Sequence, residues 1–273
     1  MYKAYWQLHT RPFESCTDAR FYYPAEAHQG ALLKLRYAVE SQLGAALLCG
    51  TAGSGKTLLV QGLRRQLDER FRPFVHLVFP KLTGPELVLY LAAELGVAGG
   101  SHTSASVAES VRGLQNFLRD NSDRGSHAVI AIDEAHLLLD TDTLETLRLL
   151  MNFEGTDKPS HTLLLVGHPQ LLAALERMQA LEARLGVKCL LRSLSLEETI
   201  SYINHRLTAA GATQEIFTTE AITALHELTA GNPRRINRLC DLALLIGYAE
   251  EQVRINAHQI ESVCNELVTI APE

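Results

Sequence analysis

A glycine-rich segment at residues 50–57 has the composition and spacing of a phosphate-binding loop. It reads Gly-Thr-Ala-Gly-Ser-Gly-Lys-Thr and matches the pattern G-x-x-x-x-G-K-[ST]. Glycines let the backbone curl so that successive N–H groups face one phosphate chain. Lys56 is then expected to contact the outer phosphates, and the Thr57 hydroxyl to bind Mg²⁺. The residues predicted to contact a nucleotide are Gly50, Thr51, Ala52, Gly53, Ser54, Gly55, Lys56, Thr57 and Leu58.

The sequence on either side of this segment supports the same interpretation. The apolar run 45–49 before it is typical of a buried strand, and residues 58–64 after it are typical of a helix. A phosphate loop requires this order, because the helix directs its partial positive end at the phosphates. An ordinary glycine-rich turn, the alternative, does not account for the order.

Two adjacent carboxylates follow a second apolar run. Residues 128–132 suit a central parallel strand without a solvent-facing side, and Asp133 and Glu134 come next. Ligand crevices in open α/β sheets lie at the carboxyl ends of the strands. Asp133 is therefore predicted to hold Mg²⁺, directly or through water, and Glu134 to polarise an attacking water. The alternative, a pair of exposed turn acids, is disfavoured by the phosphate loop.

Three further polar residues are candidates for contact with phosphate. His168 follows the apolar run 163–166, where it is suited either to positioning the attacked phosphate or to an ordinary strand-to-helix turn. Arg184 follows a helical segment, and Arg234 opens another one. A guanidinium grips phosphate oxygens during phosphoryl transfer, although a single arginine is more often a surface ion-pair residue.

Short apolar runs alternate with longer amphipathic segments through the first two thirds of the chain. This alternation predicts parallel strands joined by right-handed crossovers, hence an α/β sheet covered on both faces. Such a fold would bring the candidate residues to one edge of the sheet. The predicted strands are 45–49, 74–79, 128–132, 162–166 and 188–191, and the predicted helices are 85–95, 105–118, 143–153 and 170–181.

The strand-like runs stop near residue 193, and helical patterns follow one another to the end. We therefore predict two domains, an α/β core at residues 1–192 and a small all-helical domain at residues 193–273. Residues 96–106, which are rich in glycine and serine, are predicted to form a surface loop. The helical domain is expected to begin its helices at Ser195, Thr219, Asn232 with Pro233, and Asn256.

The composition excludes several classes of protein. The chain has 273 residues and a net charge of −6, so no overall basic field attracts nucleic acid or anionic lipid. No run of about 20 apolar residues indicates a membrane span, and the first residues lack the apolar core of a signal peptide. Apart from His168, the histidines show no ligand spacing and are predicted to be solvated or packing residues. Scattered cysteines without zinc-ligand spacing favour a reduced, cytoplasmic setting: Cys16, Cys49, Cys189, Cys240 and Cys264.

Taken together, these motifs resemble the AAA+ ATPases, which combine Walker A and Walker B motifs with a helical lid. Within this family, the sequence resembles the general secretion pathway protein A type and its relatives. That similarity is carried by an aromatic amino-terminal segment and by four further stretches spread over nearly the whole chain. These stretches are Tyr5-Trp6-Gln7-Leu8 with Arg11-Pro12-Phe13 and Phe21-Tyr22-Tyr23, His28 to Leu35, Leu165 to Leu171, Tyr202 to Gly211, and Gly231 to Asp241.

The resemblance implies a P-loop fold with a five-stranded parallel sheet, ATP and Mg²⁺ as cofactors, and ATP hydrolysis. Arg234 is similar to the sensor 2 arginine, which reaches from the lid to the nucleotide of its own subunit. Arg184 is similar to the arginine finger, which implies an active homo-oligomer such as a hexameric ring, with the finger acting in trans. The aromatic segment is implied to close over the adenine.

The chain departs from the family pattern at two places. His168 occupies the sensor 1 position, where Asn, Thr or Gln is more typical. Pro80 and Lys81 follow the second predicted strand, where AAA+ proteins often place a polar residue that restrains the catalytic glutamate.

Three functions are compatible with these features. The first is an ATP-driven motor or switch for a secretion or envelope complex, located in the cytoplasm or forming the cytoplasmic module of an inner-membrane-associated protein. The second is a DNA-binding ATPase that regulates transposition, for which Arg234, Arg235 and Arg238, with Arg206 nearby in sequence, would supply a basic face. The alternative is that Arg234 faces the nucleotide and the others pair with Asp241, Glu250 or Glu251. The third, a scaffold with a structural nucleotide, is disfavoured because it does not require the pair Asp133 and Glu134.

Overall fold

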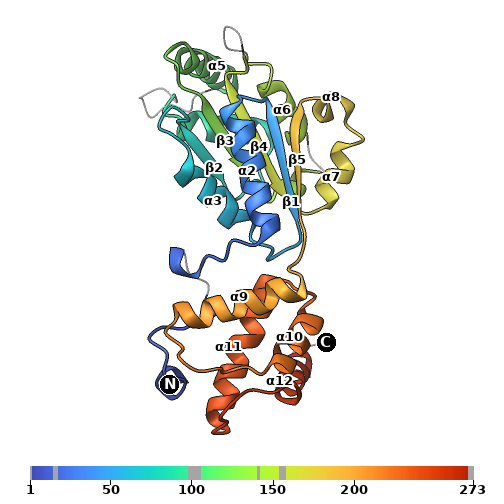
Figure 1. Ribbon diagram of the computed structural model, residues 1–273. Helices are drawn as coiled ribbons and strands as arrows, with labels where there is room; N and C mark the ends of the chain where they lie inside the picture. Colours follow the sequence, from blue (N-terminus) through green and yellow to red (C-terminus); the bar gives the residue numbers. More distant parts are fainter. Residues whose placement is uncertain (1, 15–17, 98–105, 140–141, 154–157, 270–273) are drawn as a thin grey trace. The chain divides into compact units, whose positions relative to one another are not determined.

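A five-stranded parallel sheet lies between residues 45 and 191 (Figure 1). The computed structural model describes all residues except 1, 15–17, 98–105, 140–141, 154–157 and 270–273. The strand order is β2-β3-β4-β1-β5, and every neighbouring pair is parallel, which confirms the predicted fold class. The strands are β1 (Ala45–Gly50), β2 (Phe74–Leu77), β3 (Ala128–Ile132), β4 (His161–Gly167) and β5 (Leu185–Leu191).

The chain divides into two compact units by its internal contacts. The core unit comprises Ala27–Ala52 and Lys56–Leu191, and the helical unit comprises Met1–Glu26, Gly53–Gly55 and Arg192–Glu273. The sequence placed the start of the carboxyl-terminal unit at residue 193, one residue after the observed division. It assigned residues 1–26 to the core, whereas the structure groups them with the helical unit.

Helices cover both faces of the sheet, so that β3 and β4 have no solvent-facing side, whereas the edge strand β5 is partly exposed. Consecutive residues of a strand point to opposite faces, so β3 sends Ile130 and Ile132 into one apolar layer and Val129 and Ala131 into the other. Burial of all five residues of this strand matches the continuous apolar run in the sequence. The helices of the core unit are α2 (Glu26–Glu40), α3 (Lys56–Gln66), α4 (Gly84–Glu94), α5 (Val107–Asp123), α6 (Thr143–Leu150), α7 (Gln170–Leu175) and α8 (Gln179–Glu182), with the 3₁₀ helix η2 (Ala135–Leu138).

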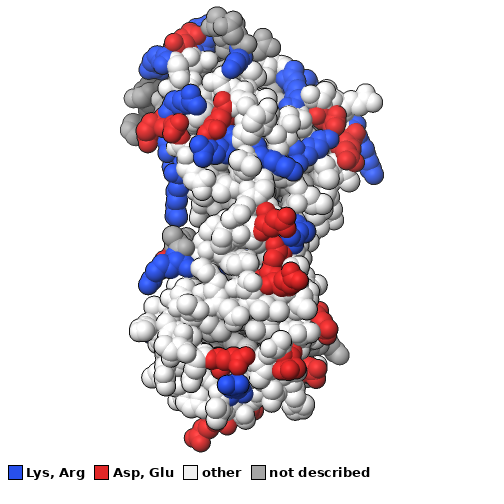
Figure 2. All heavy atoms as spheres, viewed as in Figure 1, with Lys and Arg blue, Asp and Glu red and all other residues white. Residues whose placement is uncertain are grey.

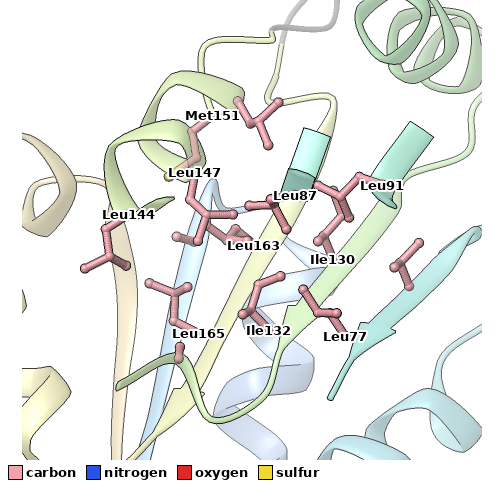
Figure 3. Close-up of a cluster of buried hydrophobic side chains, with 14 of the residues drawn as sticks. Leu77, Leu87, Leu91, Ile130, Ile132, Leu144, Leu147, Met151, Leu163 and Leu165 are labelled. Carbon is pink, nitrogen blue, oxygen red and sulfur yellow. The ribbon is translucent and has the colours of Figure 1, made fainter. Parts of the chain in front are cut away.

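One apolar layer lies between the sheet and α4, α5, α6 and α7. Figure 3 shows its centre, where Leu87 and Leu91 of α4 meet Ile130, Ile132 and Leu77 from β3 and β2. The second layer lies between the opposite face and helices α2 and α3. These two apolar layers hold the strands in place and thereby position the loops at the strand ends.

The helical unit contains α9 (Leu196–Ala209), α10 (Thr219–Thr229), α11 (Pro233–Ala249) and α12 (Ala257–Thr269). Ser195 forms the predicted capping box with Glu198, and Asn232 caps α11 as expected. The cap of α10 is Thr218 rather than Thr219. Asn256 accepts a hydrogen bond from the N–H of Gln259, so the last helix also begins where predicted.

The aromatic amino-terminal segment is part of the core of this helical unit. Trp6, Phe13 and Phe21 are buried among residues of α9, α10 and α11, and the indole N–H of Trp6 donates to the Leu244 carbonyl at 2.9 Å. The family resemblance implies that this segment closes over the adenine. In the structure, Trp6, Phe13 and Phe21 pack within the helical unit.

A buried arginine fastens that segment to α9. The Arg206 guanidinium donates to the main-chain carbonyls of Pro12, at 2.6 Å, and Glu14, at 2.9 Å. It also lies over the Phe21 ring, 5.2 Å from the centroid. Because a buried charge is tolerated only when its donors are satisfied, Arg206 is committed to this role and is not available for a basic surface.

Several element boundaries differ from the sequence predictions. The single helix expected at 170–181 is two short helices, because Met178 has a non-helical backbone (φ −98°, ψ 71°). β2 ends at Leu77, and the next two apolar residues, Val78 and Phe79, are exposed. The α2 helix was not predicted.

Most of the predicted loop 96–106 and Cys16 lie outside the described residues, while Cys49, Cys189, Cys240 and Cys264 are free.

Two buried histidines lie at the amino-terminal ends of β3 and β4. His127 Nε2 is 2.8 Å from the Thr162 hydroxyl, and His161 is fully enclosed. Burial lowers the pKa of each to about 4, with a smaller contribution from Lys158 for His127 and from His127 for His161. Both rings are therefore neutral in the folded protein.

We predict that acid destabilises the core unit in the window between pH 6.5 and pH 4. The unfolded chain binds protons near pH 6.5 while the folded chain does not, so the free energy of unfolding falls by up to about 1.4 kcal/mol per pH unit for each histidine. Urea unfolding followed by circular dichroism at pH 7.5, 6.0 and 5.0 measures this slope. The variant His127→Gln, which keeps an amide near Thr162, should show a shallower slope; an unchanged slope would contradict the assignment.

Candidate functional site

The phosphate-loop residues connect β1 to α3, as predicted. Gly53 and Gly55 have φ angles of +80° and +95°, a region that glycine adopts without steric cost. α3 begins at Lys56 itself, so its free N–H groups face the loop. The buried Lys56 ammonium donates to the carbonyls of Gly50, at 3.0 Å, and Thr51, at 3.2 Å. This geometry is that of an anion-binding turn at a helix amino terminus.

Asp133 lies at the same edge of the sheet as the loop. Its Oδ2 accepts a hydrogen bond from the Thr57 hydroxyl at 2.6 Å and lies 3.6 Å from His76 Nε2. Burial alone would raise the pKa of Asp133, but the nearby His76 ring and hydrogen bonds from Thr57 and the Glu134 N–H together lower it. The side chain is therefore an ionised carboxylate beside a hydroxyl, and these two oxygens are ligands that suit Mg²⁺.

Glu134 turns away from the strand in a left-handed backbone conformation (φ 50°, ψ 33°). Such a conformation in a residue other than glycine costs about 1 kcal/mol or more. The Glu134 N–H donates to Asp133 Oδ1 at 2.9 Å, which stabilises the turn. The side chain is 45% exposed, so it faces solvent next to the buried Asp133.

His168 lies at the end of β4, which pairs with β3. The pairing brings it close to His136, the second residue of η2, with ring centroids 5.9 Å apart. His136 Nδ1 in turn lies 3.4 Å from Glu134 Oε2. Three of the predicted residues, Asp133, Glu134 and His168, thus lie at neighbouring strand ends.

Sequence reasoning missed two histidines at this edge. His76 and His136 were assigned solvated or packing roles, yet each lies beside one of the two carboxylates. A signal was present in both cases, because His76 lies within a predicted strand and His136 comes two residues after Glu134. The contact between His76 and Asp133 depends on the pairing of β2 with β3, which the sequence does not reveal.

Arg184 lies at the amino-terminal ends of the strands, at the opposite end of the sheet from the phosphate loop. It precedes Leu185, which pairs with Ala45 at the start of β1, whereas the phosphate loop follows the other end of β1. Its guanidinium donates to Asn152 Oδ1 at 2.5 Å and to the Arg148 carbonyl at 3.4 Å. The structure therefore does not bring Arg184 to the phosphate loop of its own chain.

Arg234 is an exposed residue in the first turn of α11 in the helical unit. The Asn232 side chain accepts hydrogen bonds from the N–H groups of Arg234 and Arg235. Gly53 belongs to the same unit, and a Cβ placed on it would lie 2.6 Å from the Cβ of Arg234. This close approach leaves no room for a larger residue at position 53.

A comparison with protein families identifies the family to which this chain belongs. Residues 39–175 match the family described as AAA domain, and this range is half of the chain and includes the phosphate loop, Asp133 and Glu134. The chain belongs to the AAA family. Membership of this family implies a nucleotide-binding ATPase fold and agrees with the predicted resemblance.

The sequence is also similar to the general secretion pathway protein A of Aeromonas hydrophila. The two are 30% identical over 275 residues, which cover 100% of this chain and 50% of that protein. The chain therefore spans half the length of this relative. No described helix of this AAA chain is long and apolar enough to span a membrane.

Several solved structures share the fold over most of the chain. The ORC2 protein of Aeropyrum pernix in ADPNP–ADP complexes has a TM-score of 0.69 and 14% identity, with 96% of this chain and 72% of that one covered. Cdc6p from Pyrobaculum aerophilum has the same TM-score, 16% identity and coverages of 96% and 74%. Drosophila ORC bound to DNA also scores 0.69, with 17% identity and coverages of 94% and 64%.

Proposed function

We propose that this AAA chain hydrolyses ATP with Mg²⁺ and uses the hydrolysis to assemble or switch a secretion or envelope complex. The observation that carries the chemistry is the hydrogen bond between Thr57 and the ionised Asp133, beside Glu134. It joins the phosphate loop to the end of β3, so one edge of the sheet holds both a phosphate cradle and an acidic pair.

The residues fit a magnesium nucleotide. Thr57 and Asp133 would hold the ion, which supplies charge stabilisation for the terminal phosphates when bound. The loop N–H groups and Lys56 orient the phosphate chain. Glu134, exposed at the rim, accepts a proton from the attacking water, and His168 lies on the neighbouring strand end to contact the attacked phosphate.

Two arginines are proposed to contact the nucleotide, one in its own chain and one in a neighbouring chain. Arg234 acts as the sensor 2 residue toward the nucleotide of its own chain. Arg184 acts in trans, because it lies at the edge opposite to its own phosphate loop. A finger supplied by a neighbour implies a homo-oligomer, such as a hexameric ring, in which each site uses residues from two chains.

The biological role is inferred from the relative in the general secretion pathway. That similarity covers the entire chain, and it supports a protein partner in a secretion or envelope complex. It also supports a cytoplasmic location, including that of a cytoplasmic module of an inner-membrane-associated protein.

The hydrolytic assignment predicts different failures for two variants. Lys56→Ala removes the charge that orients the outer phosphates and should weaken ATP binding at least about tenfold. Glu134→Gln removes only water activation, so it should bind ATP normally and hydrolyse it about 10²–10⁴ times more slowly. Phosphate release with Mg²⁺ or with EDTA, together with nucleotide titrations, measures both. The exposed His258→Ala is the control, and a Glu134→Gln chain that works at the parent rate would overturn the assignment.

The trans role of Arg184 predicts complementation. Arg184→Ala and Glu134→Gln chains should each be nearly inactive, because one lacks the finger and the other lacks the base. A mixture should regain hydrolysis, since a site with an intact Glu134 then receives Arg184 from the other chain. Phosphate release at increasing ratios of the two variants measures the recovery. A mixture no more active than its components would refute a finger that acts between chains.

DNA binding is the second candidate. It is favoured by the exposed Arg234, Arg235 and Arg238 on α11 and by the likeness to an ORC structure bound to DNA. Two observations oppose it. Arg206 is buried and bound to main-chain carbonyls. In addition, basic and acidic side chains are interspersed over the visible face of the core unit (Figure 2), and the net charge is −6.

We therefore expect that the chain does not bind duplex DNA, with or without ATP. Fluorescence anisotropy with a labelled duplex at 50 and 200 mM salt tests this, because phosphate contacts make affinity fall steeply with salt. Binding at 50 mM that is lost both at 200 mM and in Arg235→Ala/Arg238→Ala would establish the DNA function instead.

A further inference from the structure

The carboxylate proposed to activate water has a neighbour with no assigned role. His136 Nδ1 lies 3.4 Å from Glu134 Oε2 and also 3.4 Å from the main-chain nitrogen of His168. One ring nitrogen is therefore placed between an acceptor, the Glu134 carboxylate, and a donor, the N–H of His168.

The position of the His136 ring is set by packing. Two other residues of η2, Ala135 and Leu138, are buried in the core layer and anchor this helix, while Leu137 is exposed. On the other side, a Cβ on Gly167 would lie 3.1 Å from the main-chain nitrogen of His136 and 3.5 Å from its Nδ1. The end of β4 thus lies directly against η2, and the imidazole is held between β4 and Glu134.

A neutral imidazole has one nitrogen that donates and one that accepts. When the proton is on Nδ1, the polar N–H attracts the Glu134 carboxylate, whose Oε2 lies 3.4 Å away. When the proton is on Nε2, Nδ1 accepts from the His168 N–H, and its lone pair faces the carboxylate. The two contacts therefore exclude each other. The position of the ring proton determines whether His136 interacts with the Glu134 carboxylate or with the His168 N–H at the end of β4.

We propose that His136 is the positioning residue for Glu134, and that it couples this carboxylate to the strand end that carries His168. The inference rests on the proposed role of Glu134 in hydrolysis. Pro80, which follows β2, has no polar side-chain group, and His76 of β2 lies beside Asp133 rather than Glu134. The restraint on the glutamate comes from η2 in this chain.

Kinetics of three substitutions at this position test the role. His136→Ala should lower kcat at least about tenfold with ATP affinity within about twofold of the parent, because a misplaced catalytic group costs turnover rather than binding. His136→Asn, whose amide lies near the position of Nδ1, should recover most of the rate. His136→Gln, whose amide lies near the position of Nε2, should not. His258→Ala is the matched control, and a His136→Ala chain with the parent kcat would overturn the proposal.

A second measurement does not depend on turnover. In protein labelled with ¹⁵N-histidine, the ring signals of His136 are identified by their loss in His136→Asn. Glu134→Gln removes the carboxylate that attracts the proton to Nδ1, so the His136 Nδ1 resonance should shift clearly in the nucleotide-free protein. An unchanged resonance would refute the contact.

The two measurements separate the possible failures. If Glu134→Gln hydrolyses ATP at the parent rate, the proposed function fails at its catalytic base, while the resonance still decides whether His136 holds Glu134. If Glu134→Gln is inactive but His136→Ala is not, only the positioning role fails.

Discussion

Burial of β3 and β4, the two central strands that end at the site, is the constraint on which the site depends. All five residues of β3 and all seven of β4 are buried, so neither strand can carry a charged group along its length without a large desolvation cost. Polar chemistry is confined to the strand ends, where the chain leaves the apolar layers. Asp133, His168 and the phosphate loop lie at such ends, and the parallel direction of the strands brings them to one edge.

The polar groups at this edge then stabilise one another. Thr57 and His76 hold Asp133 ionised although it is buried, and Asp133 in turn accepts the N–H that fixes the turn at Glu134. The left-handed backbone of Glu134 moves its side chain out of the buried edge while its neighbour stays inside. Two adjacent carboxylates therefore have different surroundings, which suits one to bind a cation and the other to exchange a proton.

The sequence was sufficient for the fold and for the centre of the site, because both depend on local patterns. Continuous apolar runs identified the strands, and the spacing of residues 50–57 identified the loop. Contacts across the sheet were not accessible in this way. His76 and His136 acquire their partners only through the pairing of β2, β3 and β4, and Arg206 was read as a surface charge although it is buried against the amino-terminal segment. The break at Met178 reflects a local backbone choice that helix periodicity does not encode.

Burial of Trp6 gives the chain an intrinsic optical probe of one unit. The sequence contains one tryptophan, and its indole is enclosed in the helical unit with a hydrogen bond to Leu244. Its emission therefore reports on the helical unit, whereas the core unit contains no indole. Comparing fluorescence with far-ultraviolet dichroism during denaturation separates the cooperativity of the two units without any label.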